Sequence, residues 1–492
     1  MNTVVGIDVG TQSLKVVFYD FETREFAAIE SAPLNLYQGS AGVAEQQSHW
    51  WLNALQDAIA RVDSDIRKSA RAIAVSGQQH GFVAVDKANE VLAPVKLWCD
   101  TSTGEECGEI MDVFGGRDAC IEQVGNPIVP GYTASKVRWF GKAKRTLYEQ
   151  MDCILLPHDY INLYLTGERC MEMGDASGTG FLDIRTRRWS KAMLHAIDAN
   201  RDLADCLPQL RLANEPVGSL RQNVADDLGL PAGIPVGIGG GDNMMGAIGT
   251  GNVRAGKVTM SLGTSGTVYA YADKPIVDPN GNIAAFCSST GGWLPLLCTM
   301  NCTVTTELMR GLLGADIAGF EAQVAAADRG ANGVMTLPFF NGERTPNLPD
   351  AKGCVVGLSS HNMNPENLLR SAVEGATYAL QFGLDELESL GVPAEEIVVT
   401  GGGAKSDEWR QIVADVCDAP VLVFEQDEGA AFGAALQALQ IVETDSCIEE
   451  LVDSHLTRDF ARCCEPRKEA VNDYKEHYEH YQRAVDVIAG LY

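Results

Sequence analysis

The chain has 492 residues and a formal net charge of −28, from 66 acidic and 38 basic side chains. This length is too great for one ordinary domain and suits two, and the acidic balance disfavours non-specific binding to nucleic acid. No apolar run is long enough to span a membrane, and the N-terminus lacks the basic-then-apolar pattern of a secretory signal. The 14 cysteines include no Cys-x-x-Cys pair, which indicates free thiols. We therefore expect a cytoplasmic protein with no nucleic-acid or membrane partner.

The first predicted element is a β-hairpin near the N-terminus. A strand-like run covers residues 4–9, and a second apolar run begins at Val16. Between the two runs lies a tight turn made of Gly10, Thr11, Gln12 and Ser13. Such a turn exposes backbone N–H groups and a hydroxyl group, which suit a phosphate. Asp8, just before the turn, is either an ordinary strand-end residue or a carboxylate that acts with a metal ion.

Polar side chains mark the turn between two further strand-like runs, within residues 72–86. This turn carries Gln79 and His80. A single histidine is more often structural than functional, but a loop rich in hydrogen-bonding groups suits a polyhydroxy ligand. Trp98 and Asp100 form a second such cluster, because an aromatic face beside a carboxylate suits a sugar. Trp98 fits a position in the hydrophobic core equally well.

Most of the sequence alternates short β-branched runs with longer amphipathic stretches, which predicts an α/β protein. In the first half, one helix is predicted from Trp139 to Tyr164. In the second half, Asn364 is a suitable N-cap for a helix that ends at Gly391. The charged tail helix predicted at residues 469–484 carries three tyrosines along one side, which we expect to pack on the protein.

A glycine run precedes a candidate catalytic acid near the middle of the chain. A short strand at residues 235–238 leads into three glycines, followed by Asp242 and Asn243. Asp242 is either a helix N-cap or a general base on a loop stripped of side chains, and the two roles are compatible. We place a domain boundary just after this run, which gives an N-terminal domain of residues 1–247 and a C-terminal domain of residues 248–492.

The hairpin pattern recurs in the second half of the chain. A strand-like run at residues 258–262 leads into Gly263 and Thr264, and another strand follows. Ser261 stands where the first hairpin has Asp8, so only one copy carries an acid. The pattern predicts two similar domains, each of which gives one phosphate-binding hairpin to a single shared nucleotide–metal site.

A second glycine run, Gly401 to Gly403, follows a predicted strand at residues 397–399 and precedes a predicted helix from Asp407. One hypothesis is a dinucleotide-binding fold, in which Glu425 is the acid that binds the ribose. The fingerprint fails at its third glycine, which is Ser406 here, and no comparable pattern opens either half of the chain. We favour a glycine platform against which the adenine of a nucleotide can lie.

Taken together, these motifs resemble those of the FGGY carbohydrate kinases, within the larger group that has an actin-like nucleotide-binding fold. Residues 8–13 are similar to the family's first phosphate motif, and residues 263–266 are similar to its second. The stretch 240–243 resembles the one that carries the family's catalytic base. Residues 353–374 are similar to the family's C-terminal signature, so the resemblance runs nearly from end to end.

The resemblance implies an α/β fold of two actin-like (ribonuclease H-like) domains that flank a cleft for nucleotide and sugar. It implies ATP and Mg²⁺ as cofactors, Asp242 as the general base, and Asp8 as a catalytic residue that holds the metal together with Asp242. The expected sugar ligands are Gln79, His80, Trp98, Asp100, Asp242 and Asn243. The expected nucleotide ligands are Gly10, Thr11, Gln12, Ser13, Gly263, Thr264, Gly402, Gly403 and Asp407.

The turn that contains Gln79 and His80 is similar to the Ser-Gly-Gln-x-His-Gly loop of the xylulose kinases within this family, so D-xylulose is the expected substrate. Many of those enzymes have Met at the position of Gln79 and Asn at the position of Cys99. Because both departures lie near the expected pocket, L-ribulose, L-xylulose and glycerol stay open as alternative substrates. A homodimer is compatible with this interpretation, although the sequence leaves the oligomeric state open.

A non-enzymatic ATPase of actin-like fold is the competing hypothesis, because the same nucleotide cleft can serve a filament, a chaperone or a regulator. A chaperone would need an extra peptide-binding domain, for which no length remains. A filament-forming protein would not need the polar turn at Gln79 and His80. The sequence therefore favours the ATP-dependent phosphorylation of a ketopentose.

Overall fold

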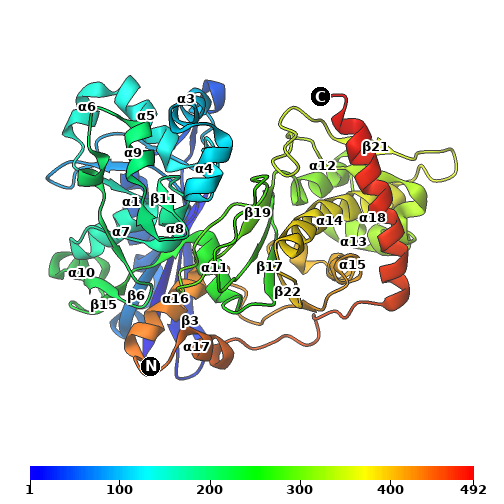
Figure 1. Cartoon of the computed structure of the whole chain (residues 1–492). Coiled ribbons are helices and arrows are strands. Elements are labelled where there is room, and N and C mark those ends of the chain that lie inside the picture. Colours follow the sequence, from blue (N-terminus) through cyan, green and yellow to red (C-terminus); the bar gives the residue numbers. More distant parts are fainter.

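The first of two lobes is built on a seven-stranded sheet, in a computed structural model that describes all residues 1–492 (Figure 1). The strand order is β14-β15-β6-β1-β2-β3, and β16 is added beside β6. The strands are β1 (Thr3–Val9), β2 (Ser13–Asp20), β3 (Glu25–Pro33), β6 (Ala70–Gly77), β14 (Pro216–Ser219), β15 (Pro235–Gly237) and β16 (Gly240–Gly241). β1 pairs antiparallel with β2 and parallel with β6, so it lies in the interior of the sheet.

Alternating side chains of β1 face two different layers, as the two-residue period of a strand requires. Val5, Ile7 and Val9 belong to the hydrophobic cluster that includes α1 (Ser48–Arg61). Val4 belongs to another cluster on the opposite face. Because both faces are covered, β1 is an almost continuous apolar run, and every one of its residues except Asp8 is fully buried.

Further helices and short strands surround this sheet and complete the first lobe. The helices are α2 (Ser64–Lys68), α3 (Gly104–Phe114), α4 (Arg117–Val124), α5 (Thr133–Ala143), α6 (Arg145–Gln150), α7 (Pro157–Thr166), α8 (Met173–Ser177), α9 (Lys191–Ile197), α10 (Gln222–Leu228) and α11 (Asp242–Gly249). The short strands are β4 (Tyr37–Gln38), β5 (Ala44–Gln46), β7 (Val83–Val85), β8 (Val95–Lys96), β9 (Cys153–Leu155), β10 (Cys170–Glu172), β11 (Leu182–Asp183), β12 (Arg188–Trp189) and β13 (Gln209–Arg211).

The long helix predicted from Trp139 to Tyr164 is wrong, because the structure breaks this segment into α5, α6, β9 and α7. The apolar run of β9 pairs antiparallel with β7 instead of continuing a helix. Pro157 then occupies the first turn of α7, where its missing N–H has no consequence for the helix. A sheet partner from a distant part of the chain therefore overrides the local helical pattern.

The second lobe repeats the arrangement around the first hairpin. Its five-stranded sheet has the order β19-β18-β17-β22-β23. β17 pairs antiparallel with β18 and parallel with β22, as β1 does with β2 and β6. The strands are β17 (Lys257–Leu262), β18 (Gly266–Ala270), β19 (Leu296–Thr299), β22 (Glu396–Thr400) and β23 (Val421–Leu422), and β20 (Met335–Leu337) pairs separately with β21 (Cys354–Val356).

The helices of the second lobe confirm most of the sequence predictions for this half. They are α12 (Thr303–Leu313), α13 (Ile317–Ala326), α14 (Pro365–Ser389), α15 (Asp407–Cys417) and α18 (Lys468–Ala489). The Asn364 side chain caps α14 by accepting a hydrogen bond from the Asn367 amide. In α18, Tyr474 and Tyr481 are buried against the lobe. No helix anywhere in the chain has both the length and the apolar character needed to cross a bilayer.

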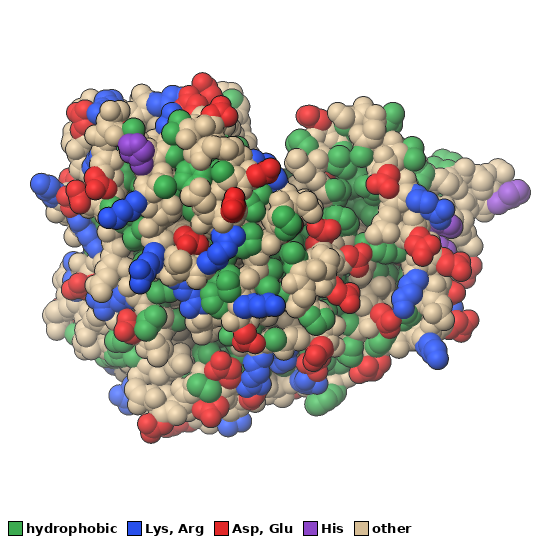
Figure 2. All heavy atoms as spheres, viewed as in Figure 1, with side chains coloured by type: hydrophobic (Ala, Val, Ile, Leu, Met, Phe, Trp, Pro, Cys, Tyr) green, Lys and Arg blue, Asp and Glu red, His purple; other side chains and the backbone are tan.

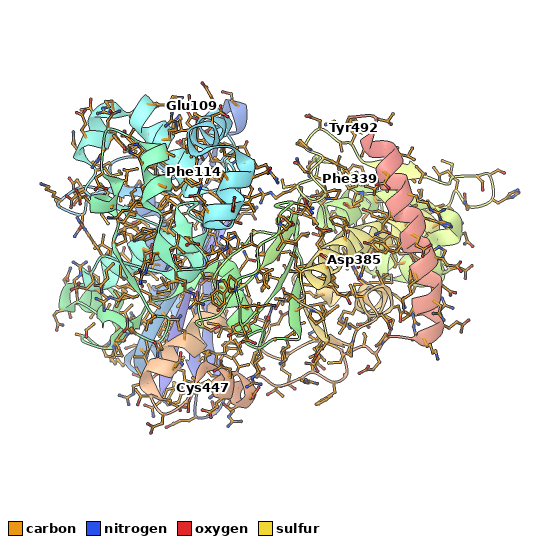
Figure 3. All side chains as sticks on the ribbon, viewed as in Figure 1. Glu109, Phe114, Phe339, Asp385, Cys447 and Tyr492 are labelled. Atoms are coloured by element: carbon orange, nitrogen blue, oxygen red, sulfur yellow. The ribbon has the colours of Figure 1, made fainter.

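Two helices from late in the sequence return to the first lobe. They are α16 (Gly429–Val442) and α17 (Ile448–His455), which lie below the first lobe near the N-terminus in Figure 1, with Cys447 at the start of α17 in Figure 3. α16 packs on β1, β6 and α11. Part of the segment 248–492 thus forms one face of the N-terminal sheet, and it links the two halves of the chain mechanically.

Glycines permit this close packing of α16. A Cβ atom on Gly433 would lie 1.8 Å from the carbonyl oxygen of Met245, and one on Gly6 would lie 1.9 Å from that of Ala431. Both neighbours are backbone atoms of packed elements, so neither can move aside easily.

Substitution of Gly433 by alanine is therefore expected to lower the free energy of unfolding by about 1–3 kcal/mol, because it overpacks the junction of α16 with α11. Urea unfolding measures the change. Gly311→Ala in α12 is the matched control, since no atom lies within 4 Å of the added methyl group and alanine favours the helix. Equal stability of the two variants would contradict the tight junction.

Candidate active site

A cavity of about 470 Å³ lies between the two lobes, and Figure 2 shows the molecular surface hollowed where they meet. Gln79, His80, Trp98, Asp242 and Asn243 line it from the first lobe, and Ser261, Gly263, Thr264 and Arg344 line it from the second. Its size suits a small ligand. Most of the sugar ligands expected from the sequence are therefore brought to one wall, opposite the second hairpin.

Asp242 is the first residue of α11, directly after the two glycines of β16. Its Oδ1 atom accepts hydrogen bonds from the amide of Asn243, at 2.8 Å, and from Nδ2 of Asn243, at 3.1 Å. Burial, together with the charges of Asp8 and Asp175, raises the pKa of Asp242 to about 8. A carboxyl group with such a pKa, at the wall of a cavity, has the properties of a general base.

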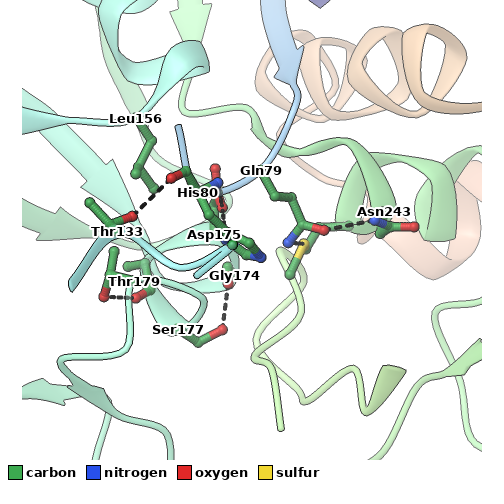
Figure 4. Close-up of polar contacts among 12 residues, drawn as sticks. Gln79, His80, Thr133, Leu156, Gly174, Asp175, Ser177, Thr179 and Asn243 are labelled. Carbon is green, nitrogen blue, oxygen red and sulfur yellow. Dashed lines mark hydrogen bonds and ion pairs between the residues drawn. The ribbon is translucent and has the colours of Figure 1, made fainter. Parts of the chain in front are cut away.

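The asparagine beside Asp242 connects it to the polar turn. Asn243 Nδ2 also donates to Gln79 Oε1 at 2.7 Å (Figure 4). Gly241 makes this approach possible, because a Cβ atom there would lie 2.7 Å from Cγ of Gln79. A glycine is therefore required at position 241, because the Gln79 side chain packs directly against it.

Asp8 lies at the end of β1, where it is partly buried and accepts a hydrogen bond from Ser76 Oγ at 2.8 Å. Burial raises the pKa of Asp8. The structure therefore places two carboxyl groups, Asp8 and Asp242, close enough for each charge to oppose the other.

These two carboxylates are a suitable pair for Mg²⁺. No cluster of three or more His, Cys, Asp or Glu side chains in the chain could hold a metal ion by itself. Mg²⁺ in phosphoryl-transfer sites usually needs only one or two carboxylates, because phosphate oxygens and water supply the other ligands. The unfavourable proximity of Asp8 and Asp242 would also be relieved by a cation. The residues present thus fit this metal.

The tips of the two hairpins present backbone amides. In the first hairpin Gly10 N donates to Ser13 O at 3.0 Å, whereas the amides of Thr11 and Gln12 donate to no acceptor in the chain. In the second, the amides of Gly263 and Thr264 are likewise without an acceptor. These are the groups that a phosphate would accept hydrogen bonds from.

Trp98 belongs to the wall of the cavity and supports the first hairpin. Its Nε1 atom donates to Thr11 Oγ1 at 3.0 Å, and the Thr11 hydroxyl donates in turn to Gln78 Oε1 at 3.0 Å. The expectation that Trp98 borders the ligand space is thus compatible with its position. The same bonds tie the first hairpin to the polar turn.

Asp100, by contrast, does not line the cavity. It is completely buried and binds Lys96 Nζ at 2.9 Å, Ser102 Oγ at 2.6 Å and the amide of Ala44 at 2.9 Å. Burial alone would raise the pKa of Asp100, but these hydrogen bonds lower it. Its role in the structure is to anchor a loop, and we do not include it among the proposed sugar ligands.

The second glycine run adjoins the second hairpin but not the cavity. A Cβ atom on Gly401 would lie 2.8 Å from the carbonyl oxygen of Leu262, and Gly403 packs against the Leu262 side chain. Gly402 has open space beside it. Asp407 has 90% of its side chain exposed and pairs with Arg410. Gly401 itself lies beside the hairpin at Gly263, because a Cβ atom on it would also lie 3.1 Å from the Gly263 amide nitrogen.

Two charged residues near the cavity, Arg344 and Asp175, were not predicted from the sequence. Arg344 lines the cavity from the second lobe, and its charge adds to the effect of burial in lowering the pKa of His80. Asp175 lies behind His80 and pairs with its ring. A single carboxylate within the small-residue run 174–178 was a signal for Asp175, but only the fold shows which loop it faces.

The raised pKa of Asp242 predicts a pH-dependent effect on stability. Between about pH 4 and pH 8 the folded protein holds a proton that the unfolded chain has lost, so the free energy of unfolding falls as the pH rises. Asparagine resembles the protonated carboxyl group. Asp242→Asn is therefore expected to stabilise the metal-free protein by about 1–2 kcal/mol near pH 8.5, and by less near pH 5.

Urea unfolding in the presence of EDTA at these two pH values measures the difference. Asp227→Asn is the control, because Asp227 is an exposed carboxylate on α10 and its loss shows the effect of removing a charge that is not buried. A stabilisation that is the same at both pH values would contradict the raised pKa.

Comparison with known proteins gives consistent matches along the whole chain. Residues 3–249 match the N-terminal domain of the FGGY family of carbohydrate kinases, and residues 258–440 match the C-terminal domain of that family. The described fold, two α/β lobes, agrees with the expectation drawn from the motifs.

Two curated relatives and one solved structure illustrate the similarity. A xylulose kinase of Haemophilus influenzae is 40% identical over 484 residues, which cover 97% of this chain and 98% of the relative. A xylulose kinase of Escherichia coli is 34% identical over 456 residues, which cover 91% of this chain and 92% of the relative. A crystal structure of a xyloylose kinase from Brucella ovis superposes with a TM-score of 0.92 at 28% identity and covers 100% of both chains.

Proposed function

The chain belongs to the FGGY family of carbohydrate kinases, and from this premise we propose that it transfers the γ-phosphoryl group of ATP to D-xylulose. The products are D-xylulose 5-phosphate and ADP. The observation that carries the proposal is the position of Asp242 in one cavity with the polar side chains of Gln79 and His80, opposite the second hairpin. The relatives named as xylulose kinases, at 34–40% identity, support the same substrate.

Asp242 acts as the general base in this proposal. The terminal hydroxyl group of the sugar gives its proton to the Asp242 carboxylate as its oxygen attacks the γ-phosphorus in line. Asn243 holds the carboxylate in place through its two hydrogen bonds to Oδ1. Because the transition state of phosphoryl transfer is loose, most of the rate comes from positioning and from electrostatic stabilisation.

The two hairpins hold the phosphates from opposite sides. The free amides of Thr11 and Gln12 in the first lobe and of Gly263 and Thr264 in the second supply the hydrogen bonds. Mg²⁺, held by Asp8 and Asp242, would offset the negative charge of the phosphates. Gly402 and Gly403 border the base of the nucleotide.

The sugar lies against Gln79, His80, Trp98 and Asn243, which line the wall of the cavity. Closure of the lobes about the contact between α11 and α16 would exclude water and bring the second hairpin toward the sugar. The proposed location is the cytoplasm, where ATP is available, and the 14 cysteines, all of them free thiols, are consistent with that reducing compartment.

ADP release from MgATP by the purified protein tests the proposal. The substrates to compare are D-xylulose, L-ribulose, L-xylulose, glycerol, gluconate and no sugar. We expect a strong preference for D-xylulose. Preference for another sugar would keep the kinase chemistry but assign a specificity change to Gln79 and Cys99. ADP release that no sugar stimulates would contradict the proposed substrate class.

A further inference from the structure

His80 has a backbone conformation that few residues other than glycine adopt. Its φ angle is +61°, in the left-handed region, which persists in a non-glycine residue only when the surroundings hold it. The backbone N–H of His80 donates to Asp175 Oδ1 at 3.1 Å. Its carbonyl oxygen accepts from Lys136 Nζ at 2.8 Å and from Thr133 Oγ1 at 3.1 Å. Asp175, Lys136 and Thr133 are buried and together fix the peptide groups of His80. Figure 4 shows Asp175 and Thr133 beside His80.

The imidazole ring of His80 is held as firmly as its backbone. Nδ1 lies 3.0 Å from the same Asp175 oxygen that accepts the backbone N–H. The ring covers Gly178 so closely that a Cβ atom there would lie 1.8 Å from Cε1 of His80. The rings of Tyr132 and Phe286 pack around it, with centroids at 5.2 and 5.3 Å. Nδ1 is buried, which leaves Nε2 as the ring nitrogen that can reach the cavity.

The charges around the ring determine which nitrogen carries the proton. Burial would raise the pKa of Asp175, but the neighbouring rings of His158 and His80 outweigh it and lower the pKa to about 2, so the carboxylate is ionised. Burial lowers the pKa of His80, so its ring is neutral and has one N–H group. Nδ1 of His80 lies 3.0 Å from Oδ1 of Asp175, although the angle is too bent for a good hydrogen bond. The proton must be on Nδ1, because an unprotonated Nδ1 would direct its lone pair at the lone pairs of the carboxylate oxygen.

We propose that Asp175 is a positioning residue for sugar binding, which holds His80 in the tautomer with its proton on Nδ1. In this tautomer Nε2 presents a lone pair to the cavity, so a hydroxyl group of the sugar donates its hydrogen bond to His80. The fixed backbone places that lone pair, and the single tautomer prevents the ring from acting as a donor instead. This inference rests on the proposed function for the identity of the ligand, but the tautomer itself does not.

The buried network behind His80 provides a matched control. Asp175 Oδ2 lies 3.4 Å from Nδ1 of His158, whose Nε2 lies 3.0 Å from Asp159 Oδ1. Asp159 is thus a completely buried carboxylate of the same network that does not contact His80. Substitution of Asp159 by asparagine disturbs the network without changing the partner of the His80 ring.

The first test is the ¹⁵N NMR spectrum of the histidine side chains in the wild-type protein without ligand. The chain has 8 histidines, and the His80→Gln variant identifies the resonances of His80 by their loss. We expect a neutral ring with a protonated Nδ1 and an unprotonated Nε2. The opposite tautomer, or an equal mixture of both, would overturn the proposal. The tautomer is read from the wild-type protein and does not depend on catalytic activity, and the His80→Gln variant serves only to assign the resonances.

The second test is the Asp175→Ala variant, which removes the acceptor of the buried Nδ1–H group and so moves the ring proton to Nε2, where the cavity can supply a partner. We expect the NMR spectrum to show that change and the KM for D-xylulose to rise by about 10–100-fold, which is the typical effect of mispairing one buried hydrogen bond. The kcat value and the KM for ATP should change by only a few-fold. Asp159→Asn should keep the wild-type tautomer and the wild-type KM for the sugar.

A purely structural role for Asp175 would give a different result. Equal losses in Asp175→Ala and Asp159→Asn, seen as lower thermal stability or less active protein with an unchanged KM for D-xylulose, would overturn the proposal. Absence of D-xylulose phosphorylation in the wild-type protein would instead contradict the proposed function, while the wild-type spectrum would still decide the tautomer.

Discussion

Substitution of Asp242 by asparagine is expected to lower kcat by about 10²–10⁴-fold, the range that removal of a general base typically produces. Asparagine has nearly the same shape and can keep the contact with Asn243, but it cannot accept the proton of the sugar hydroxyl group. The dissociation constant for D-xylulose should therefore stay within a few-fold of the wild-type value. Steady-state ADP release and isothermal titration calorimetry measure the two quantities.

The pH dependence provides an independent check of the role of Asp242. The base must be ionised to act, and its pKa in the ligand-free protein is about 8. The kcat/KM value of the wild-type enzyme at low Mg²⁺ should therefore rise with pH up to that region, and the residual activity of Asp242→Asn should lack this rise. Asp227→Asn is the control for a carboxylate outside the cavity. Activity of a folded Asp242→Asn enzyme above about a tenth of the wild-type value would rule out its role as the base.

Substitution of Asp8 by alanine is expected to raise the Mg²⁺ concentration for half-maximal activity by about tenfold or more, since one of two proposed carboxylate ligands is lost. The same substitution removes a negative charge that raises the pKa of Asp242. The acid limb of the pH profile should therefore move to lower pH. A Mg²⁺ titration at fixed ATP and a pH profile at saturating Mg²⁺ measure the two effects.

The control for this variant is Ser76→Ala, which removes only the hydrogen bond of 2.8 Å to Asp8 Oδ1. It should change the Mg²⁺ requirement far less than Asp8→Ala does. An unchanged Mg²⁺ titration in Asp8→Ala would contradict the assignment of Asp8 to the metal. An unchanged acid limb would contradict the electrostatic coupling of Asp8 with Asp242.

Local sequence patterns predicted the elements whose structure depends on neighbouring residues. The strand–turn–strand pattern at residues 4–18 and its echo at 258–269 predicted two hairpins, and the structure has both. The N-cap at Asn364 predicted the start of α14, because a side chain three residues from its partner amide needs no distant contact. The helix expected at residues 139–164 failed because the pairing of β9 with β7 is not a local property.

For the site, the sequence predicted residue types better than it predicted contacts. Asp242 and the polar turn at Gln79 and His80 were found from their polar character and glycine neighbours, and the structure places them at one cavity. Asp100 has the same local signals but turns toward Lys96 and Ser102, where it is completely buried. A carboxylate beside a tryptophan is equally compatible with a ligand and with an internal ion pair, and only the surrounding packing distinguishes them.

The two strand–turn–strand hairpins, the α/β class, the family and the candidate base could be predicted from the sequence, because each depends on short motifs with a fixed local geometry. The folded chain was needed to show that α16 returns to cover the N-terminal sheet and that Asp175 lies behind the ring of His80, 95 residues away in the chain. Those contacts join segments that carry no pattern in common. Their partners are selected by close packing at glycines and by the need of buried polar groups to be paired, which are properties of the folded chain as a whole.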